Sequence, residues 1–289
     1  MRRIMVRKKR ARYAGVWPID ERACKPPEGW KGWPDGKKFA LVLTHDVDTV
    51  KGYEKCYYLI KLEERLGFRS SFNFVPKRYS VSSGLIDYLN NHGFEVGVHG
   101  LYHDGKLYNS KEMFFERAKD INKYLKEWNA VGFRSPSMQH NLEWIHELDI
   151  EYDFSTFDTD PFEPQPDGVQ TIFPFYVHKD NGDNGYVELP YTLPQDFTLF
   201  VLMKETDIGI WKQKLDWVAE QGGMALLNTH PDYMNFSRKP GLEEYPSSYY
   251  EQFLKVLETK YSGQYWKVLP RDVARFWVKS LASIKSDTK

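Results

Sequence analysis

Short apolar runs alternate with segments of helical periodicity along most of the chain. Continuous apolar runs, typical of strands buried on both faces of a parallel sheet, occur at 39–47, 70–76, 95–100, 130–136, 152–156, 224–231 and 265–270. Apolar residues recur every three or four positions at 50–66, 82–92, 110–127, 141–148, 206–220, 247–260 and 271–283, which predicts helices. The alternation predicts an α/β fold with a parallel sheet.

The number of strand–helix units, about seven, favours closure into a barrel over an open doubly wound sheet. The sequence contains neither GxGxxG nor GxxxxGK[ST], so the usual reason to expect a nucleotide-binding open sheet is missing. Residues 157–185 break the rhythm with many Pro, Asp and Gly residues, and strands are predicted around them at 171–177 and 186–193. We expect the region 157–193 to shape the choice of substrate.

The first 38 residues have a different composition. Residues 1–12 hold no acidic residue and seven basic ones: Arg2, Arg3, Arg7, Lys8, Lys9, Arg10 and Arg12. Such a run predicts a solvated, disordered arm, although it could contact anionic lipid at about 1 kcal/mol per basic residue. Residues 13–38 are rich in Trp, Pro and Gly and predict an irregular extension that packs its Trp side chains on a neighbouring surface. We therefore expect a basic arm and extension at 1–38 and a single barrel domain at 39–289.

Charge and cysteine content limit the choice of partners and compartment. The 40 basic and 40 acidic residues give a formal charge of zero, so no polyanionic partner such as nucleic acid is predicted. Cys24 and Cys56 form no CxxC motif or disulfide framework. No apolar run follows the basic start, as it would in a signal peptide, and no run is long enough to cross a membrane. These features predict a cytoplasmic protein that could lie against the inner face of the membrane; they say nothing about oligomeric state.

Aromatic residues make up 16% of the chain, which is high. Large aromatic side chains dominate ordinary cores, and this interpretation is favoured. The alternative is a carbohydrate site, because apolar sugar faces stack on aromatic rings.

Polar residues follow several of the predicted strands at the points where the strands end. Reactive residues of a parallel barrel gather at the carboxyl ends of its strands. The residues at these ends are Asp46 and Asp48 after the first strand, His99 and His103 after the third, Arg134 after the fourth, and His230 after the strand at 224–231. Their shared position predicts one cavity.

The types and spacing of these residues are typical of a catalytic metal site. His99 and His103 are four apart and could reach one ion if the segment turns tightly; the alternative is two unrelated histidines. Asp46 and Asp48 point to the same side if the strand persists, although Asp48 or Thr49 could instead cap the helix that starts at 50. One aspartate and two histidines leave an open coordination position.

The remaining polar groups then have natural roles. The second aspartate would act as general base, and Arg134 would hold that base ionised and oriented. His230 would be the general acid that protonates the departing group.

Four short motifs at these strand ends resemble the polysaccharide deacetylase family, also called the NodB homology or carbohydrate esterase 4 group. They are THDVD at 44–48, HGLYH at 99–103 after EVGV, RSP at 134–136 and LNTH at 227–230. The resemblance runs from about residue 39 to 231 and implies a distorted (β/α)7 barrel. It also implies that Asp46 is the base, that Asp48, His99 and His103 bind the metal, and that His230 is the acid.

The sequence departs from the family pattern in two places. Val47 stands where the second aspartate usually lies, so the roles of Asp46 and Asp48 could be exchanged, and Gly100 replaces the usual Ser or Thr. The family supplies an acidic partner for the acid histidine; here Asp158 and Asp160 are the candidates, and Asp160 is favoured.

The resemblance implies a metal-dependent hydrolase that removes N-acetyl groups from an amino sugar. The metal implied is zinc, although an Asp-His-His set also suits cobalt, nickel or manganese. Because no export signal is evident, the resemblance favours the members that act in O-antigen or capsule assembly, on a nucleotide-, lipid- or polymer-linked sugar. The alternatives are an allantoinase-like C–N hydrolase of the same fold and an inactive, carbohydrate-binding scaffold.

Overall fold

The computed structural model describes residues 2–179, 185–237, 239 and 241–287. Its main sheet has the order β11-β1-β2-β3-β4-β5-β7-β6, with β8 also paired to β1. The strands are β1 (Phe39–Val47), β2 (Ser71–Phe74), β3 (Glu95–His99), β4 (Gly132–Arg134), β5 (Tyr152–Asp153), β6 (Phe175–His178), β7 (Gly185–Glu188), β8 (Met224–Thr229) and β11 (Tyr265–Lys267). The pairings in this sheet are parallel, except that between β6 and β7.

The long strand β1 lies at the centre of this curved sheet. Its first residues pair with β11 and its last residues with β2, while β8 runs beside it in register from Ala40 to His45. Beyond β7, the chain continues to Leu193, which forms a parallel bridge with Leu227 of β8. The backbone N–H groups of Thr192 and Leu193 donate to the carbonyl of Leu226. The sheet therefore curls into the expected distorted (β/α)7 barrel, with these contacts joining its last segment to β8.

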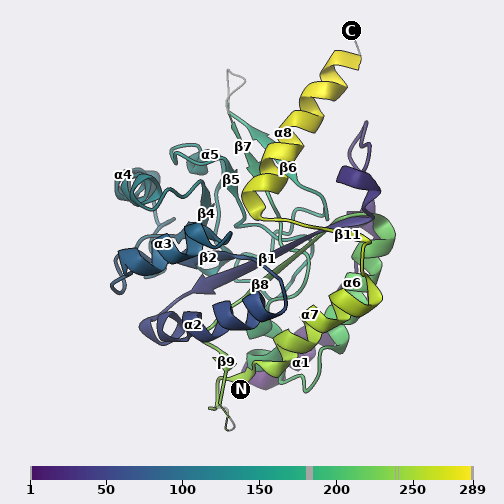
Figure 1. Cartoon of the computed structure of the whole chain (residues 1–289), viewed down its shortest axis with the longest axis horizontal. Coiled ribbons are helices and arrows are strands. Elements are labelled where there is room, and N and C mark those ends of the chain that lie inside the picture. The colour runs from purple at the N-terminus through teal and green to yellow at the C-terminus, as the bar shows by residue number, and fades with distance from the viewer. Residues whose placement is uncertain (1, 180–184, 238, 240, 288–289) are drawn as a thin grey trace.

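Helices lie around the outside of the sheet (Figure 1). They are α2 (Val50–Arg65), α3 (Ser83–Asn91), α4 (Lys111–Glu127), α5 (Leu142–Ile145), α6 (Gly209–Gln221), α7 (Ser248–Lys260) and α8 (Pro270–Asp287). Capping side chains explain two of the starts: Thr49 accepts from the N–H of Lys51, and Ser110 accepts from the N–H of Met113. In the described ranges, no helix is long and apolar enough to cross a bilayer.

The basic start of the chain is a helix, which corrects the expectation of a disordered arm. Helix α1 (Arg2–Arg12) packs beside the π-helical segment η4 (Phe197–Met203). Arg10 forms an ion pair with Glu205, which fixes the helix to the residues after η4. Arg, Lys, Met and Ala are all good helix formers, so a neighbouring surface is enough to order this run.

Three further features differ from the sequence-based expectation. β6 and β7 are neighbours in the chain and pair antiparallel, as strands joined by a short connection do. Segment η4 was not predicted. The chain after β8 also forms a small parallel ladder between β9 (Met234–Asn235) and β10 (Tyr245–Pro246).

The tryptophans of the N-terminal extension pack against the barrel. Trp33 donates from Nε1 to the carbonyl of Gly222 at 2.8 Å, and the ring of Trp30 lies 5.0 Å from that of Trp277 on α8. The ring of Trp17 meets that of Phe162 edge-on at 5.0 Å. The extension therefore supports the loop that carries Phe162, which lines the pocket described below.

Glu95 begins β3, at the opposite end of the strand from His99. Its burial predicts that the free energy of unfolding depends on pH. Its carboxylate accepts from the Tyr152 hydroxyl at 2.9 Å and from the Arg271 N–H at 3.2 Å, but burial raises its pKa from 4.5 to about 7. The folded state therefore binds this proton more tightly than the unfolded state. The stabilisation is fully present below about pH 4.5 and is lost as the pH rises through about 7, a change of about 3 kcal/mol.

Glu95→Gln removes this titration while keeping the shape of the side chain. We expect the wild-type free energy of unfolding to fall relative to that of the variant between about pH 5 and about pH 8. Urea unfolding of both proteins at the two pH values measures the difference. Parallel changes in the two proteins would show that Glu95 does not titrate in this range.

Candidate active site

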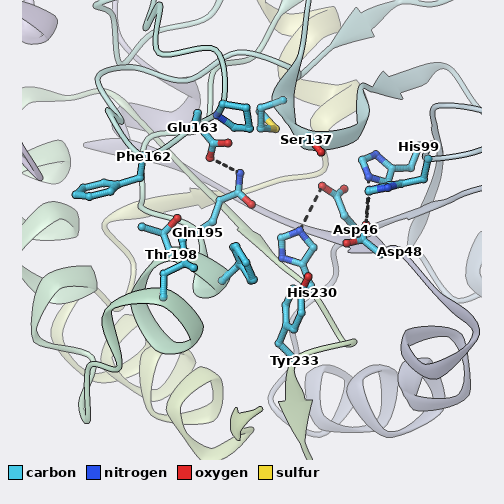
Figure 2. Close-up of a pocket in the computed structure, with 15 residues that line it drawn as sticks. Asp46, Asp48, His99, Ser137, Phe162, Glu163, Gln195, Thr198, His230 and Tyr233 are labelled. Carbon is cyan, nitrogen blue, oxygen red and sulfur yellow. Dashed lines mark hydrogen bonds and ion pairs between the residues drawn. The ribbon is translucent and has the colours of Figure 1, made fainter. Parts of the chain in front are cut away.

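A pocket of about 270 Å³ lies at the carboxyl ends of the barrel strands. Asp46 is the second-last residue of β1, and Asp48 follows this strand. His99 ends β3, and His230 follows β8. Figure 2 shows Asp46, Asp48 and His99 on one side of the pocket and Glu163 on the other. The structure thus brings together the residues that the sequence placed at strand ends.

Asp48, His99 and His103 form a compact triad. Oδ1 of Asp48 lies 3.3 Å from Nε2 of His99 and 3.2 Å from Nε2 of His103, and one ligand atom from each residue falls within 4.8 Å of the others. Burial alone would raise the pKa of Asp48, but its contacts with His103 and His99 outweigh burial and hold the pKa well below its ordinary value.

A tight turn brings His103 back toward His99. Gly100 has φ +60°, and a Cβ there would lie 2.5 Å from Cγ of Pro136. Both the backbone conformation and the lack of space therefore favour glycine.

The triad fits a divalent cation. Nδ1 of His99 lies 3.0 Å from the carbonyl oxygen of Arg134 and must donate to it, which leaves the Nε2 lone pair free for a metal. Oδ1 of Asp48 is buried and receives no hydrogen bond from the described residues. Burying such an oxygen without a partner is costly, and a cation would supply the partner. Three N and O ligands beside an open pocket are the set expected of a catalytic ion.

Asp232 holds the segment that carries Asp48. Its carboxylate accepts hydrogen bonds from the backbone N–H groups of Asp48 and Thr49, each at 3.0 Å. Gly52 lies against it, since a Cβ at that position would come within 2.0 Å of Oδ2 of Asp232. Asp232, two residues after His230, thus fixes the position of Asp48, the triad member that follows β1.

Asp46 lies between two amide donors. Nδ2 of Asn73 donates to its Oδ1 and Nδ2 of Asn228 donates to its Oδ2, both at 2.8 Å. Burial would raise the pKa of Asp46, but the charge of Arg134 leads the effects that outweigh burial and lower it. Asp46 is therefore ionised at neutral pH and is held in a fixed orientation.

Arg134 acts on Asp46 through charge, without a hydrogen bond. Its Nε lies 3.6 Å from Oδ1 of Asp46, its Nη2 donates to Oγ1 of Thr44 at 3.1 Å, and its guanidinium carbon lies 3.9 Å from the ring centroid of Phe154. The side chain is fully buried. The two amides orient Asp46, while Arg134 supplies the positive charge that the sequence led us to expect.

His230 is paired with Asp196, which corrects the expectation that Asp160 would be its partner. Oδ1 of Asp196 lies 2.7 Å from Nδ1 of His230, and Oδ2 accepts from the His230 N–H at 2.8 Å and from the Tyr245 hydroxyl at 2.9 Å. Asp160 instead accepts from the N–H of Phe162 and lines a separate cavity with Asp158. Burial opposes the charged form of His230, but Asp196 outweighs it and raises the pKa to about 10.

Nothing matches this chain among protein-family models or among curated proteins. Its structure is similar to solved structures. A protein from Mycobacterium smegmatis inferred to be a polysaccharide deacetylase is 18% identical, with coverage of 87% of this chain and 94% of that one and a TM-score of 0.67. One from Pseudomonas aeruginosa PAO1, inferred to have the same activity, is 16% identical, with coverage of 88% and 95% and a TM-score of 0.65. The chain has the polysaccharide deacetylase fold.

The same fold also carries another activity. The allantoinase PuuE is 15% identical, covers 88% of this chain and 94% of its own, and has a TM-score of 0.65. A fold does not by itself determine a reaction. The chemistry of this polysaccharide deacetylase fold must therefore be argued from the residues in its pocket.

Several residues in and around the pocket were not found from the sequence. Asn73 and Asn228 each carried a signal, because each is an amide within an otherwise apolar strand (SFNF and LLNT). Glu163 carried none, because it comes from an irregular segment in which acidic residues are common, and nothing near Asp196 in the sequence pointed to His230. Asp196 is supplied by the segment that begins η4, and η4 itself was not predicted.

The pairing of His230 with Asp196 predicts a change in the pH profile. In Asp196→Asn, the carboxylate that raises the pKa of His230 is gone, so the His230 ring loses its proton at lower pH. We expect kcat to fall by about 10² to 10⁴-fold and its alkaline limb to move to lower pH. Asp160→Asn is the matched control and should leave the position of that limb unchanged. If Asp160→Asn moved the limb and Asp196→Asn did not, the assignment would be wrong.

Proposed function

We propose that this protein is a divalent-metal-dependent hydrolase that removes the N-acetyl group from an amino sugar. The observation that carries the proposal is the position of three potential ligands, Asp48, His99 and His103, within one ion's reach beside Asp46 and His230. The fold shared with proteins described as polysaccharide deacetylases supports it. A divalent ion held by the triad would polarise the acetyl carbonyl and lower the pKa of a water molecule.

Asp46 is the proposed general base. It is ionised, it is oriented by Asn73 and Asn228, and it lines the pocket beside the triad. It takes a proton from water as the water oxygen attacks the carbonyl carbon of the amide. Because Arg134 stabilises the carboxylate, Asp46 stays ionised between turnovers.

His230 is the proposed general acid. Asp196 holds its Nδ1, so Nε2 is the nitrogen that faces the pocket, 4.0 Å from Oδ2 of Asp46. The raised pKa keeps the ring protonated at neutral pH. Nε2 donates this proton to the amide nitrogen as the C–N bond breaks, so that the products are acetate and a free amino sugar.

A second candidate function is the hydrolysis of a cyclic ureide. It is favoured by the similarity to an allantoinase structure, which matches this chain over nearly the same extent as the deacetylases do. The reaction also breaks a C–N bond at a carbonyl and could use the same base and acid. An inactive, carbohydrate-binding scaffold is the third candidate, and the ionised base beside three intact ligand residues argues against it.

Acetate release from a panel of N-acetylated amino sugars tests the proposal. The panel contains nucleotide-linked, lipid-linked and oligosaccharide forms, with allantoin as the cyclic ureide, and the protein is loaded with zinc, cobalt, nickel or manganese or treated with a chelator. We expect equal amounts of acetate and free amine from at least one sugar, and none after chelation. Turnover of allantoin alone would favour the second candidate, and metal loading without turnover of any compound would favour the scaffold. The carrier of the sugar stays a prediction from the sequence.

A further inference from the structure

The wall of the pocket that faces the triad is built from an irregular segment and from η4. Glu163, Phe162 and Pro164 come from the chain after β5, and Phe197 and Leu202 come from η4. Figure 2 shows Glu163 across the pocket from Asp48 and His99. The wall therefore combines apolar side chains with three polar ones, Gln195, Thr198 and Glu163, and Glu163 supplies its carboxyl group.

The two oxygens of the Glu163 carboxyl have different surroundings. Oε1 accepts from the Tyr191 hydroxyl at 2.6 Å and from Nε2 of Gln195 at 2.8 Å. In the described part of the chain, no donor reaches Oε2. Oε2 is thus the atom left for a ligand in the pocket.

Glu163 can donate a hydrogen bond at neutral pH. It is 8% exposed, and burial together with the charge of Asp160 raises its pKa to about 8. Since Oε1 already accepts two hydrogen bonds, the proton belongs on Oε2. His230 and Arg134 are the positive groups that act on it, and they only partly offset the rise in pKa.

A chain of amides connects Glu163 to the proposed base. Gln195 donates from Nε2 to Glu163, and its Oε1 lies 3.5 Å from Nδ2 of Asn228. The same nitrogen of Asn228 donates to Asp46 at 2.8 Å. These contacts place Glu163 and Asp46 in one hydrogen-bonded network.

We propose that Glu163 is a specificity-determining residue that binds an uncharged hydroxyl of the sugar carrying the acetamido group. A sugar ring has a hydroxyl-bearing edge and apolar faces, and this wall places the Glu163 carboxyl group beside the apolar side chains of Phe162 and Pro164. A carboxylate or phosphate at the same position of the sugar would lie near the negative charge of Asp160, which acts on Glu163, and would be repelled by that charge. The inference rests on the function proposed above and adds the residue that selects a neutral substrate.

Kinetics of Glu163→Ala and Glu163→Gln on the sugar that wild-type protein deacetylates test the proposal. Glu163→Ala should raise KM by about tenfold and leave kcat within about threefold, because Glu163 contacts no reacting atom. Glu163→Gln should restore KM, since its amide oxygen can accept from Tyr191 and Gln195 while its nitrogen donates to the sugar. An unchanged KM in Glu163→Ala, or a KM in Glu163→Gln no better than in Glu163→Ala, would overturn the proposal.

Deoxy analogues of the sugar identify the hydroxyl and guard against a folding defect. With wild-type protein, one analogue should lose about tenfold in kcat/KM, and the same analogue should lose nothing further with Glu163→Ala. An analogue bearing a carboxylate at that position should be a poor substrate of wild-type protein. Equal losses for every deoxy analogue in both proteins would overturn the role of Glu163 while leaving the deacetylase function intact. Absence of wild-type turnover on any acetylated sugar would instead overturn the proposed function itself.

Discussion

His103→Ala is expected to lower the affinity for a divalent metal by more than about 100-fold. Loss of a residue that only hydrogen-bonds a metal ligand already lowers metal affinity by up to about 100-fold. Deacetylation should fall with it. His103 is partly exposed at the rim of the pocket, and its Nε2 lies 3.2 Å from Oδ1 of Asp48. Its removal therefore opens the triad without leaving a cavity in the core. Elemental analysis after dialysis, together with acetate release, measures both effects.

His92→Ala is the matched control for this change. His92 is exposed after α3, and its ring stacks on Tyr88 before β3 begins, at the opposite end of that strand from His99. The control should keep the metal content and activity of the wild-type protein. Full metal content and full activity in His103→Ala would show that His103 is not a ligand.

Substitutions of the two aspartates of THDVD are expected to have different effects. Asp46→Asn should bind metal normally and lose about 10² to 10⁴-fold in kcat, because it removes the base but not a ligand. Asp48→Asn should lose metal, because its Oδ1 is the oxygen that faces both histidines. This pair of variants decides whether the roles are exchanged, a question that Val47 leaves open in the sequence.

The measurement is metal content and single-turnover rate for both variants under the same conditions. Asp46→Asn places an amide between the amides of Asn73 and Asn228, so its melting temperature must be compared with that of the wild-type protein. Loss of metal in Asp46→Asn with retention in Asp48→Asn would reverse the two roles.

The sequence predicts the barrel well because its signals are local. A buried parallel strand is a continuous apolar run, and a capped helix carries its own start, as Thr49 and Ser110 do. The strand ends were found for the same reason, because Asp46, His99 and His230 interrupt or end apolar runs. The parallel topology then brings these ends together.

The parts that the sequence did not reveal depend on contacts between distant segments. Asp160 lies in irregular chain and Asp196 caps η4, and only the packing of η4 places Asp196 on His230. The arm at 1–12 was expected to be disordered from its charge alone, yet a surface to pack on and the ion pair with Glu205 order it as α1. Nor does the local pattern show that Gly100 is required, because the reason is the position of Pro136.

The most direct test of a metal-dependent deacetylase is a titration of chelator-treated protein with a divalent metal while acetate release is followed. The described residues hold one Asp-His-His triad, which predicts that activity rises linearly and reaches its plateau at one equivalent of metal per chain. His103→Ala in the same titration should stay inactive at one equivalent. Activity of the metal-free protein equal to that of the loaded protein would contradict the account.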